Sequence, residues 1–219
     1  MVFTFRERYE EELGYLASIL SPGDVFIDAG AGYGIYSLLA AQQVGESGQV
    51  LAFEPAARTF EVLERNIALN SLTNVIERRV ALADRSGTTS LFIYADGSRN
   101  SLGGGASAGA RQTVETSTLD EELARARLNR VDVIKIDTEG AEEIVLRGAK
   151  RVLAGSHPMV IFEANPEAAS HLGLKAEGAW NLLLGGGYRF WRLDNFGYLQ
   201  SLASPPAFGN VVAIHGTRK

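Results

Sequence analysis

The sequence predicts an α/β fold in which a mostly parallel β-sheet is covered by helices on both faces. Short runs of β-favouring residues alternate with segments of helical spacing along most of the 219 residues, and this alternation is typical of parallel strands joined by helical crossovers. A glycine-rich turn follows the first apolar run and opens a helix. No repeat or change in composition divides the chain, so we expect one domain over residues 1–219.

The elements are expected in a regular order. Residues 1–22 predict an N-terminal cover helix, because Leu13, Leu16 and Leu20 share helical spacing before the turn at Pro22-Gly23. Strands are expected at 25–29, 49–53, 75–81, 88–94, 112–116, 131–137, 159–163, 188–193 and 211–214. Further helices are expected after the glycine turn and at 57–69, 117–126, 141–153 and 167–184. The turn residues Asp194-Asn195 predict an extra β-hairpin late in the chain.

The composition restricts the function classes. The chain carries 21 basic and 26 acidic residues, a net charge of −5, so it lacks the broad basic face that a nucleic-acid-binding protein normally has. The absence of cysteine excludes disulfides, thiolate metal sites and a cysteine nucleophile. No apolar run approaches the roughly 20 residues that span a bilayer, and the amino end is unlike a secretory signal. We therefore expect a cytoplasmic protein with no nucleic-acid or membrane partner.

The turn after the first strand indicates a ligand pocket. Gly30, Gly32 and Gly34 alternate with other residues there, and glycine lets a backbone turn sharply and approach a ligand where a Cβ would intrude. Asp28 precedes the turn, and a carboxylate at this place repels a pyrophosphate but suits an ammonium group or a ribose hydroxyl. The arrangement favours a cationic, phosphate-free cofactor such as S-adenosylmethionine.

Acidic residues end four of the five predicted core strands. They are Asp28, Glu54, Asp137 with Glu139 close behind it, and Glu163. Ligands of an open parallel sheet bind beyond the carboxyl ends of its strands, so we expect these acids to share a site. Glu54 lies about 20 residues after the glycine turn, the spacing at which an acid can accept both ribose hydroxyls of an adenosine.

The residues after the third predicted strand are candidates for an adenine site. Ala81 and Leu82 are expected to bracket the adenine ring, and Asp84 is expected to accept from its exocyclic amine. These assignments depend on the third strand ending near residue 81.

Six segments resemble the successive motifs of the FkbM methyltransferases. They are residues 28–37, Glu54-Pro55, 66–70, 117–120, 134–142 and Phe162-Glu163. The similarity covers about residues 24–165, and the most specific signature is the pattern of Lys135, Asp137, Glu139, Gly140 and Glu142. The sequence departs from the family at Gly32, where asparagine is usual.

The resemblance implies a class I methyltransferase (Rossmann-like) fold with a mostly parallel seven-stranded sheet, helices on both faces and an extra β-hairpin. It implies S-adenosylmethionine as cofactor and O-methylation of a hydroxyl on a small molecule, a sugar or natural product. Following the family pattern, Glu54 faces the ribose and Asp137 lies beside the sulfonium. The expected cofactor-binding residues are Asp28, Gly30, Ala31, Gly32, Gly34, Ser37, Glu54, Pro55, Ala81, Leu82 and Asp137.

The general base is left open among three acids, Asp137, Glu139 and Glu163. The histidines are poorly placed for this role, because His157 precedes a strand and so lies at the opposite edge of the sheet. Glu142 is expected in the first turn of a helix, where an acid complements the helix dipole.

A bound metal is a second possibility at the same edge. Asp137 with Glu163 and Asn165 offers the oxygen ligands that Mg²⁺ accepts, and a bound cation would lower the pKa of a coordinated hydroxyl.

Two alternative functions stay open. A nicotinamide-dependent oxidoreductase also uses a glycine turn, but the third glycine of the dinucleotide pattern is missing, because Ile35 follows Gly34. A binding module could keep the cofactor pocket without turnover.

Residues 97–111, which are rich in Gly, Ser and Ala, are expected to form a flexible loop or a lid over substrate. The oligomeric state and the acceptor are not specified by the sequence.

Overall fold

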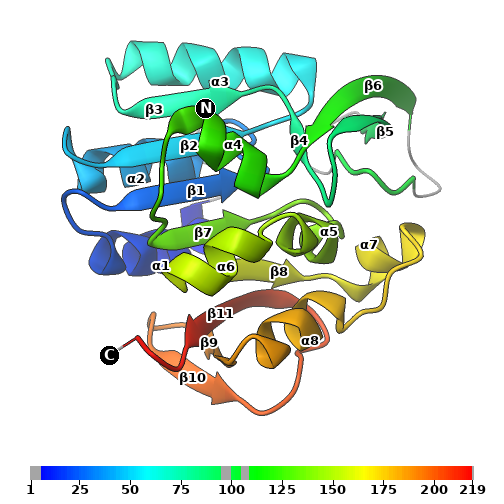
Figure 1. Cartoon of the computed structure of the whole chain (residues 1–219). Helices are drawn as coiled ribbons and strands as arrows, with labels where there is room; N and C mark the ends of the chain where they lie inside the picture. The colour runs from blue at the N-terminus through cyan, green and yellow to red at the C-terminus, as the bar shows by residue number, and fades with distance from the viewer. Residues whose placement is uncertain (1–5, 95–99, 105–108, 219) are drawn as a thin grey trace.

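The structure, a computed structural model, describes residues 6–94, 100–104 and 109–218. Helices and strands alternate along this part of the chain as expected (Figure 1). In chain order the elements are α1 (Arg6–Ile19), β1 (Val25–Ala29), α2 (Ile35–Val44), β2 (Gln49–Phe53), α3 (Ala57–Leu69), β3 (Val75–Arg78), β4 (Ala81–Leu82), β5 (Gly87–Ile93), β6 (Ala110–Ser117), α4 (Leu119–Ala126), β7 (Val133–Ile136), α5 (Glu142–Arg147), α6 (Lys150–Ser156), β8 (Met159–Ala164), α7 (Pro166–His171), α8 (Gly178–Gly185), β9 (Tyr188–Leu193), β10 (Leu199–Leu202) and β11 (Gly209–His215).

A large mixed sheet forms the centre of the molecule, with the strand order β10-β9-β11-β8-β7-β1-β2-β3. The strands β3, β2, β1, β7 and β8 run parallel, whereas β11 is antiparallel to both β8 and β9. The expected seven strands are β9, β11, β8, β7, β1, β2 and β3, and the predicted hairpin adds β10 beside β9 at the edge of the sheet. In the register of the central strands, Ile27 of β1 lies between Leu51 of β2 and Ile134 of β7.

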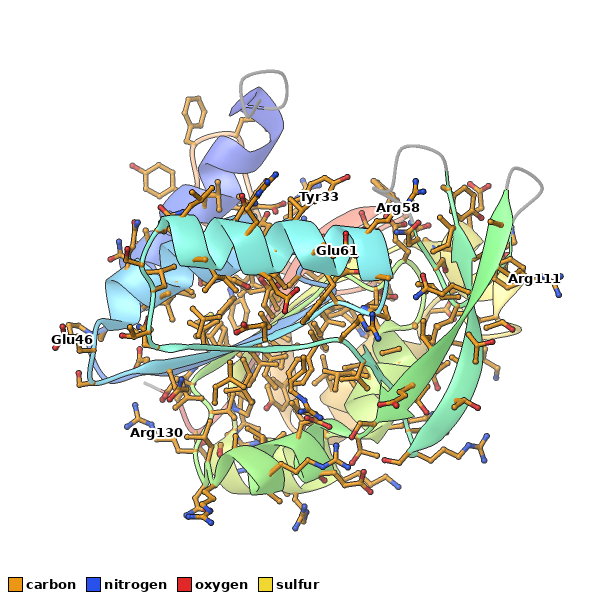
Figure 2. All side chains as sticks on the ribbon, turned by 90° about the horizontal axis from the view of Figure 1, so that it is seen from above. Tyr33, Glu46, Arg58, Glu61, Arg111 and Arg130 are labelled. Atoms are coloured by element: carbon orange, nitrogen blue, oxygen red, sulfur yellow. The ribbon has the colours of Figure 1, made fainter. Side chains whose placement is uncertain are left out.

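Helices cover both faces of this sheet (Figure 1). Side chains of α1, α2 and α3 pack on one face in a core that includes Leu16, Tyr36 and Leu63. Side chains of α4, α5, α6 and α8 pack on the other face, in a core that includes Leu146 and Trp180. Figure 2 shows the sheet between these two helix layers when the molecule is viewed from the α3 side. The predicted N-terminal cover helix is therefore present as α1.

A smaller three-stranded sheet lies beside the main one, with the order β4-β6-β5. The two long strands β5 and β6 form an antiparallel hairpin, which projects from the right of Figure 1. The third strand was expected to run from 75 to 81, but β3 ends at Arg78 and Ala81 belongs to β4, which pairs with β6. Of the lid predicted at 97–111, residues 97–99 and 105–108 lie outside the described part of the chain.

Two predicted helices are each divided in two. The helix expected at 141–153 is α5 and α6, separated at Gly148, where a Cβ would lie 2.0 Å from the carbonyl oxygen of Ala83. The helix expected at 167–184 is α7 and α8, separated by a turn in which Gly173 has φ 68°. Both breaks occur where a glycine allows close approach or left-handed backbone. Among the described residues, no helix has the length and apolar character needed to cross a membrane.

Candidate active site

The acidic residues predicted at the strand ends gather at one edge of the main sheet. Asp28 lies within β1, Glu54 directly follows β2, and Asp137 directly follows β7. Backbone hydrogen bonds extend the sheet into this region, because Asp137 N donates to Ala29 O at 2.9 Å and Gly30 N donates to Phe53 O at 2.9 Å. The carboxyl ends of the three central strands thus converge on the glycine turn.

The three glycines of this turn all adopt left-handed backbone, with φ 82° at Gly30, 56° at Gly32 and 89° at Gly34. A Cβ on Gly30 would lie 1.9 Å from the carbonyl oxygen of Asp137, and a Cβ on Gly34 would lie 2.6 Å from Leu63 Cδ1. These two glycines therefore permit close packing within the protein, whereas the sequence had suggested that they make room for a ligand.

Only Gly32 borders open space among the three, since no atom of the described chain lies within 4 Å of its ideal Cβ position. Its φ of 56° lies in the small left-handed region that asparagine also tolerates. The usual asparagine and the glycine found here therefore fit the same backbone. The glycine leaves no side chain on the open side of the turn.

Asp28 is almost fully buried beneath the turn. Its carboxylate accepts a hydrogen bond of 2.6 Å from Ser37 Oγ in the first turn of α2. Burial raises the pKa of Asp28 to about 6, although the Ser37 hydrogen bond and the charge of Lys135 oppose the shift. Asp28 and Ser37, both expected at the cofactor site, are thus in contact, and a cation above them would favour the ionised carboxylate.

Glu54 closes the other side of the turn. Its two carboxylate oxygens accept hydrogen bonds from Gly32 N at 3.0 Å and Ala56 N at 2.8 Å. Burial raises the pKa of Glu54 to about 7 in spite of these hydrogen bonds. Glu54 therefore connects the open residue of the glycine turn to the start of α3, next to Pro55.

The other predicted cofactor residues occupy the surroundings of this turn. Ala31 N donates to Phe53 O at 2.9 Å, and its side chain is buried. Ala81 and Leu82 are both buried in β4, where Leu82 contributes to the main core. Asp84 is exposed and lies 3.7 Å from the guanidinium of Arg85. The contacts of Ala81, Leu82 and Asp84 with an adenine ring stay predictions.

The three candidate catalytic acids lie together. Oxygens of Asp137, Glu139 and Glu163 all lie within 4.8 Å of one another, and all three side chains are partly exposed. Asn165 was expected as a metal ligand, but its Oδ1 accepts from Ala168 N as the N-cap of α7 and its amide nitrogen donates to Glu163. A role of Asn165 as a metal ligand stays a prediction, and the acidic cluster itself consists of Asp137, Glu139 and Glu163.

Glu142 lies in the first turn of α5, as expected, and its side chain also supports the turn that precedes this helix. It is buried, and its Oε1 accepts from Thr138 N at 3.1 Å and Gly140 N at 3.2 Å. These hydrogen bonds hold a turn in which Glu139 has φ 53°, a conformation that is rare for a non-glycine residue and often found at functional sites. Burial raises the pKa of Glu142 to about 7. Glu142 thus fixes the backbone that presents Glu139.

The prediction left out Lys135, although it is part of the signature. This lysine is 1% exposed, its Nζ donates to Asp137 Oδ2 at 2.9 Å, and it lies 4.3 Å from the centre of the Tyr36 ring. Burial alone would lower its pKa, but the charges of Asp137 and Asp28 together raise it. The signal in the sequence was a lysine flanked by isoleucines within a buried strand.

Part of the predicted lid contacts the same cluster. Ser101 is buried, pairs with Phe92 of β5, and donates from Oγ to the carbonyl oxygen of Glu139 at 2.7 Å. Gly103 packs against the end of α7, where a Cβ would lie 3.0 Å from His171 Cβ. Through Ser101, this loop therefore contacts the turn that presents Glu139.

Two of the three histidines lie away from the acids, as expected. The rings of His157 and His215 stack with centroids 3.8 Å apart, and His215 ends the antiparallel strand β11, at the edge opposite to the acids. Neither ring can serve as a base for a ligand held near Asp137.

Comparison with solved structures defines the class of fold. The chain is similar to a crystal structure described as methyltransferase FkbM from Methylobacillus flagellatus, with 13% identity, a TM-score of 0.58 and coverage of 93% of this chain but 50% of that one. It is also similar to fibrillarin from Aeropyrum pernix, which was solved with S-adenosyl-L-methionine bound, at 13% identity and a TM-score of 0.54, over 93% of this chain and 74% of that one. The chain therefore has the class I methyltransferase fold.

The sequence identifies the family. Residues 28–190 match the methyltransferase FkbM domain, and the chain is 29% identical over 181 residues to methyltransferase sdnD of Sordaria araneosa, covering 67% of this chain and 68% of that protein. The chain belongs to the FkbM methyltransferase family. It spans half the length of the Methylobacillus chain.

Proposed function

We propose that the protein transfers the methyl group of S-adenosylmethionine to a hydroxyl of a small molecule, a sugar or natural product. The observation that carries the proposal is the position of Asp137, Glu139 and Glu163, whose oxygens lie within 4.8 Å of one another next to the glycine turn. A carboxylate favours the cationic methyl donor and can also accept the proton of a hydroxyl.

The residues around the turn fit the donor. Asp28 and Glu54 are buried carboxyls whose raised pKa values reflect the cost of holding their charge away from water. A sulfonium or ammonium group above them would offset this cost. Gly32 leaves space on the side of the turn that faces outward, and the Glu54 carboxylate beside it is an acceptor suited to ribose hydroxyls.

The acids would act on the acceptor. The acceptor oxygen forms a bond to the methyl carbon while the methyl–sulfur bond breaks, and its electron pair stays on sulfur, which leaves as a neutral thioether. Such a transfer depends mainly on holding the three atoms in line. The hydroxyl proton passes to a carboxylate of the cluster, with Asp137 nearest to Lys135 and Glu139 held by the turn that Glu142 fixes.

Donor binding should depend on pH. The sulfonium favours ionised Asp28 and Glu54, so the affinity for S-adenosylmethionine is expected to rise between about pH 5.5 and 7.5 and then level off. Replacing Glu54 with glutamine should weaken binding at pH 7.5 by about 10- to 100-fold and flatten this rise. Isothermal titration calorimetry across this pH range measures both effects.

In the ligand-free protein, the same two carboxyls lower the stability as the pH rises. The folded-state pKa values of Asp28 and Glu54 are raised, so their contribution to stability is present at low pH and is lost as the pH rises to about 7.

The matched control for Glu54→Gln is Glu61→Gln, on the outer side of α3 (Figure 2), which should bind the donor as the unmodified protein does. Absence of donor binding by the unmodified protein at any pH would refute the proposed function.

Whether methyl transfer requires a metal ion can be tested with the same protein. Mg²⁺ bound by Asp137, Glu139 and Glu163 would lower the pKa of a coordinated acceptor hydroxyl. If Mg²⁺ acts in this way, the formation of S-adenosylhomocysteine will stop after treatment with EDTA and return with added Mg²⁺. Full turnover in EDTA would instead assign proton removal to the carboxylates alone.

Turnover also separates the proposal from its alternatives. A methyltransferase forms S-adenosylhomocysteine only when a hydroxylated acceptor is supplied, whereas a binding module binds the donor without converting it. A nicotinamide-dependent oxidoreductase would bind NAD in preference to S-adenosylmethionine, and competition between the two ligands measures this directly.

A further inference from the structure

A cavity of about 100 Å³ lies beneath α1, beside the acid cluster. Most of its walls are apolar or aromatic, contributed by Tyr15, Leu16, Tyr36, Ile161, Leu193 and Val212. Three polar side chains, Glu12, Lys135 and Asn210, complete the lining. Ligand pockets are typically built in this way, with apolar walls and a few placed polar groups.

The register of the sheet places this cavity next to the proposed reaction site. Lys135 of β7 pairs with Ile161 of β8, and Ile161 pairs with Val212 of β11, so these three cavity residues are neighbours on one face. Two residues further toward the acidic edge, the same face of the strands carries Asp137, Glu163 and Asn210, because side chains alternate with a period of two. Glu163 and Asn210 are themselves register partners.

The polar side chains of the cavity form a partly satisfied network. Glu12 accepts from Tyr36 Oη at 2.6 Å and from the amide nitrogen of Asn210. Asn210 Oδ1 is buried and has no hydrogen-bond partner among the described residues. A buried acceptor without a donor is costly, and such groups in native structures call for a partner. Lys135, which is 1% exposed, keeps N–H donors beyond the one that it gives to Asp137.

We propose that this cavity is a specificity subsite for the methyl acceptor, and that it receives a second hydroxyl on a small, largely apolar carbon skeleton. This inference rests on the proposed function. A hydroxyl can donate to Asn210 Oδ1 and accept from Lys135 Nζ with the same oxygen. The apolar and aromatic side chains that complete the lining suit a carbon skeleton, so a diol of this kind binds better than a mono-alcohol.

Binding of two matched probes tests the subsite. With S-adenosylhomocysteine bound, cis-cyclopentane-1,2-diol is expected to bind about tenfold more tightly than cyclopentanol, as measured by ligand-observed NMR titration. Asn210→Leu has similar volume but lacks both polar atoms, so the two probes should bind this variant within about threefold of each other. Asn181→Leu, an exposed position on α8, is the matched control and should keep the tenfold preference.

The controls separate failure of the subsite from failure of the proposed function. Calorimetry with S-adenosylhomocysteine alone reports the donor site, and circular dichroism melting reports whether Asn210→Leu is folded. Equal affinity of the unmodified protein for the two probes, or no binding of either while S-adenosylhomocysteine binds, would overturn the subsite. The comparison of the two probes in the unmodified protein tests the subsite even if Asn210→Leu does not fold.

Discussion

Replacing Asp137 with asparagine is expected to slow methyl transfer by about 10²- to 10⁴-fold, the range over which a positioned acid or base contributes to catalysis. Asparagine keeps the size of the side chain but cannot accept a proton, and it removes the charge that faces Lys135 at 2.9 Å. The measurement is the rate of S-adenosylhomocysteine formation with an acceptor that supports turnover.

Binding separates this effect from a structural one. Asp137→Asn should still bind S-adenosylmethionine, with a smaller loss of affinity than of rate, because Asp28 and Glu54 stay in place. Glu61→Gln removes the same charge from the outer side of α3 (Figure 2) and should leave the rate unchanged. A rate for Asp137→Asn within about threefold of the unmodified protein would assign the base to Glu139 or Glu163 instead.

Replacing Gly30 with alanine is expected to abolish donor binding and to lower the thermal stability strongly. The new Cβ would lie 1.9 Å from the carbonyl oxygen of Asp137, and the residue would have φ 82°. Left-handed backbone costs a non-glycine residue about 1–3 kcal/mol, and the contact would also force the ends of β1 and β7 apart. Thermal unfolding and calorimetry with S-adenosylmethionine measure the two consequences.

Gly32→Asn is the matched comparison in the same turn. No atom lies within 4 Å of the Cβ position there, and asparagine tolerates φ 56°, so this variant should fold and bind the donor. Equal melting temperatures for Gly30→Ala and the unmodified protein would show that the β1 and β7 ends can separate without cost.

Much of the fold could be predicted because it depends on local patterns. The spacing of leucines in α1, the apolar runs of β1, β7 and β8 and the turn before β10 are all visible in neighbouring residues. The breaks at Gly148 and Gly173 were missed for different reasons. At Gly148 the restricting group is the carbonyl of Ala83, which is distant in sequence, whereas Gly173 lay within a segment whose helical spacing otherwise continued.

The site could be predicted only in part. Acids at the ends of parallel strands must meet at one edge, so the grouping of Asp137 with Glu163 followed from topology. The strand topology does not show which side chains are buried, so the buried position of Lys135 beside Asp137 was not predicted. The hydrogen-bond partners of individual side chains could not be predicted either, so the N-cap that Asn165 provides for α7 was not expected.

The buried position of Lys135 has a consequence for how the binding of the two proposed ligands is linked. Its charge acts on Asp28, under the proposed donor pocket, and on Asp137, beside the proposed acceptor site. In the proposed reaction a cationic donor would change the electrostatic potential at both carboxylates, so we expect the free energies of donor and acceptor binding to be coupled. Such coupling is reciprocal, and the acceptor must alter the dissociation constant of the donor by the same factor by which the donor alters that of the acceptor.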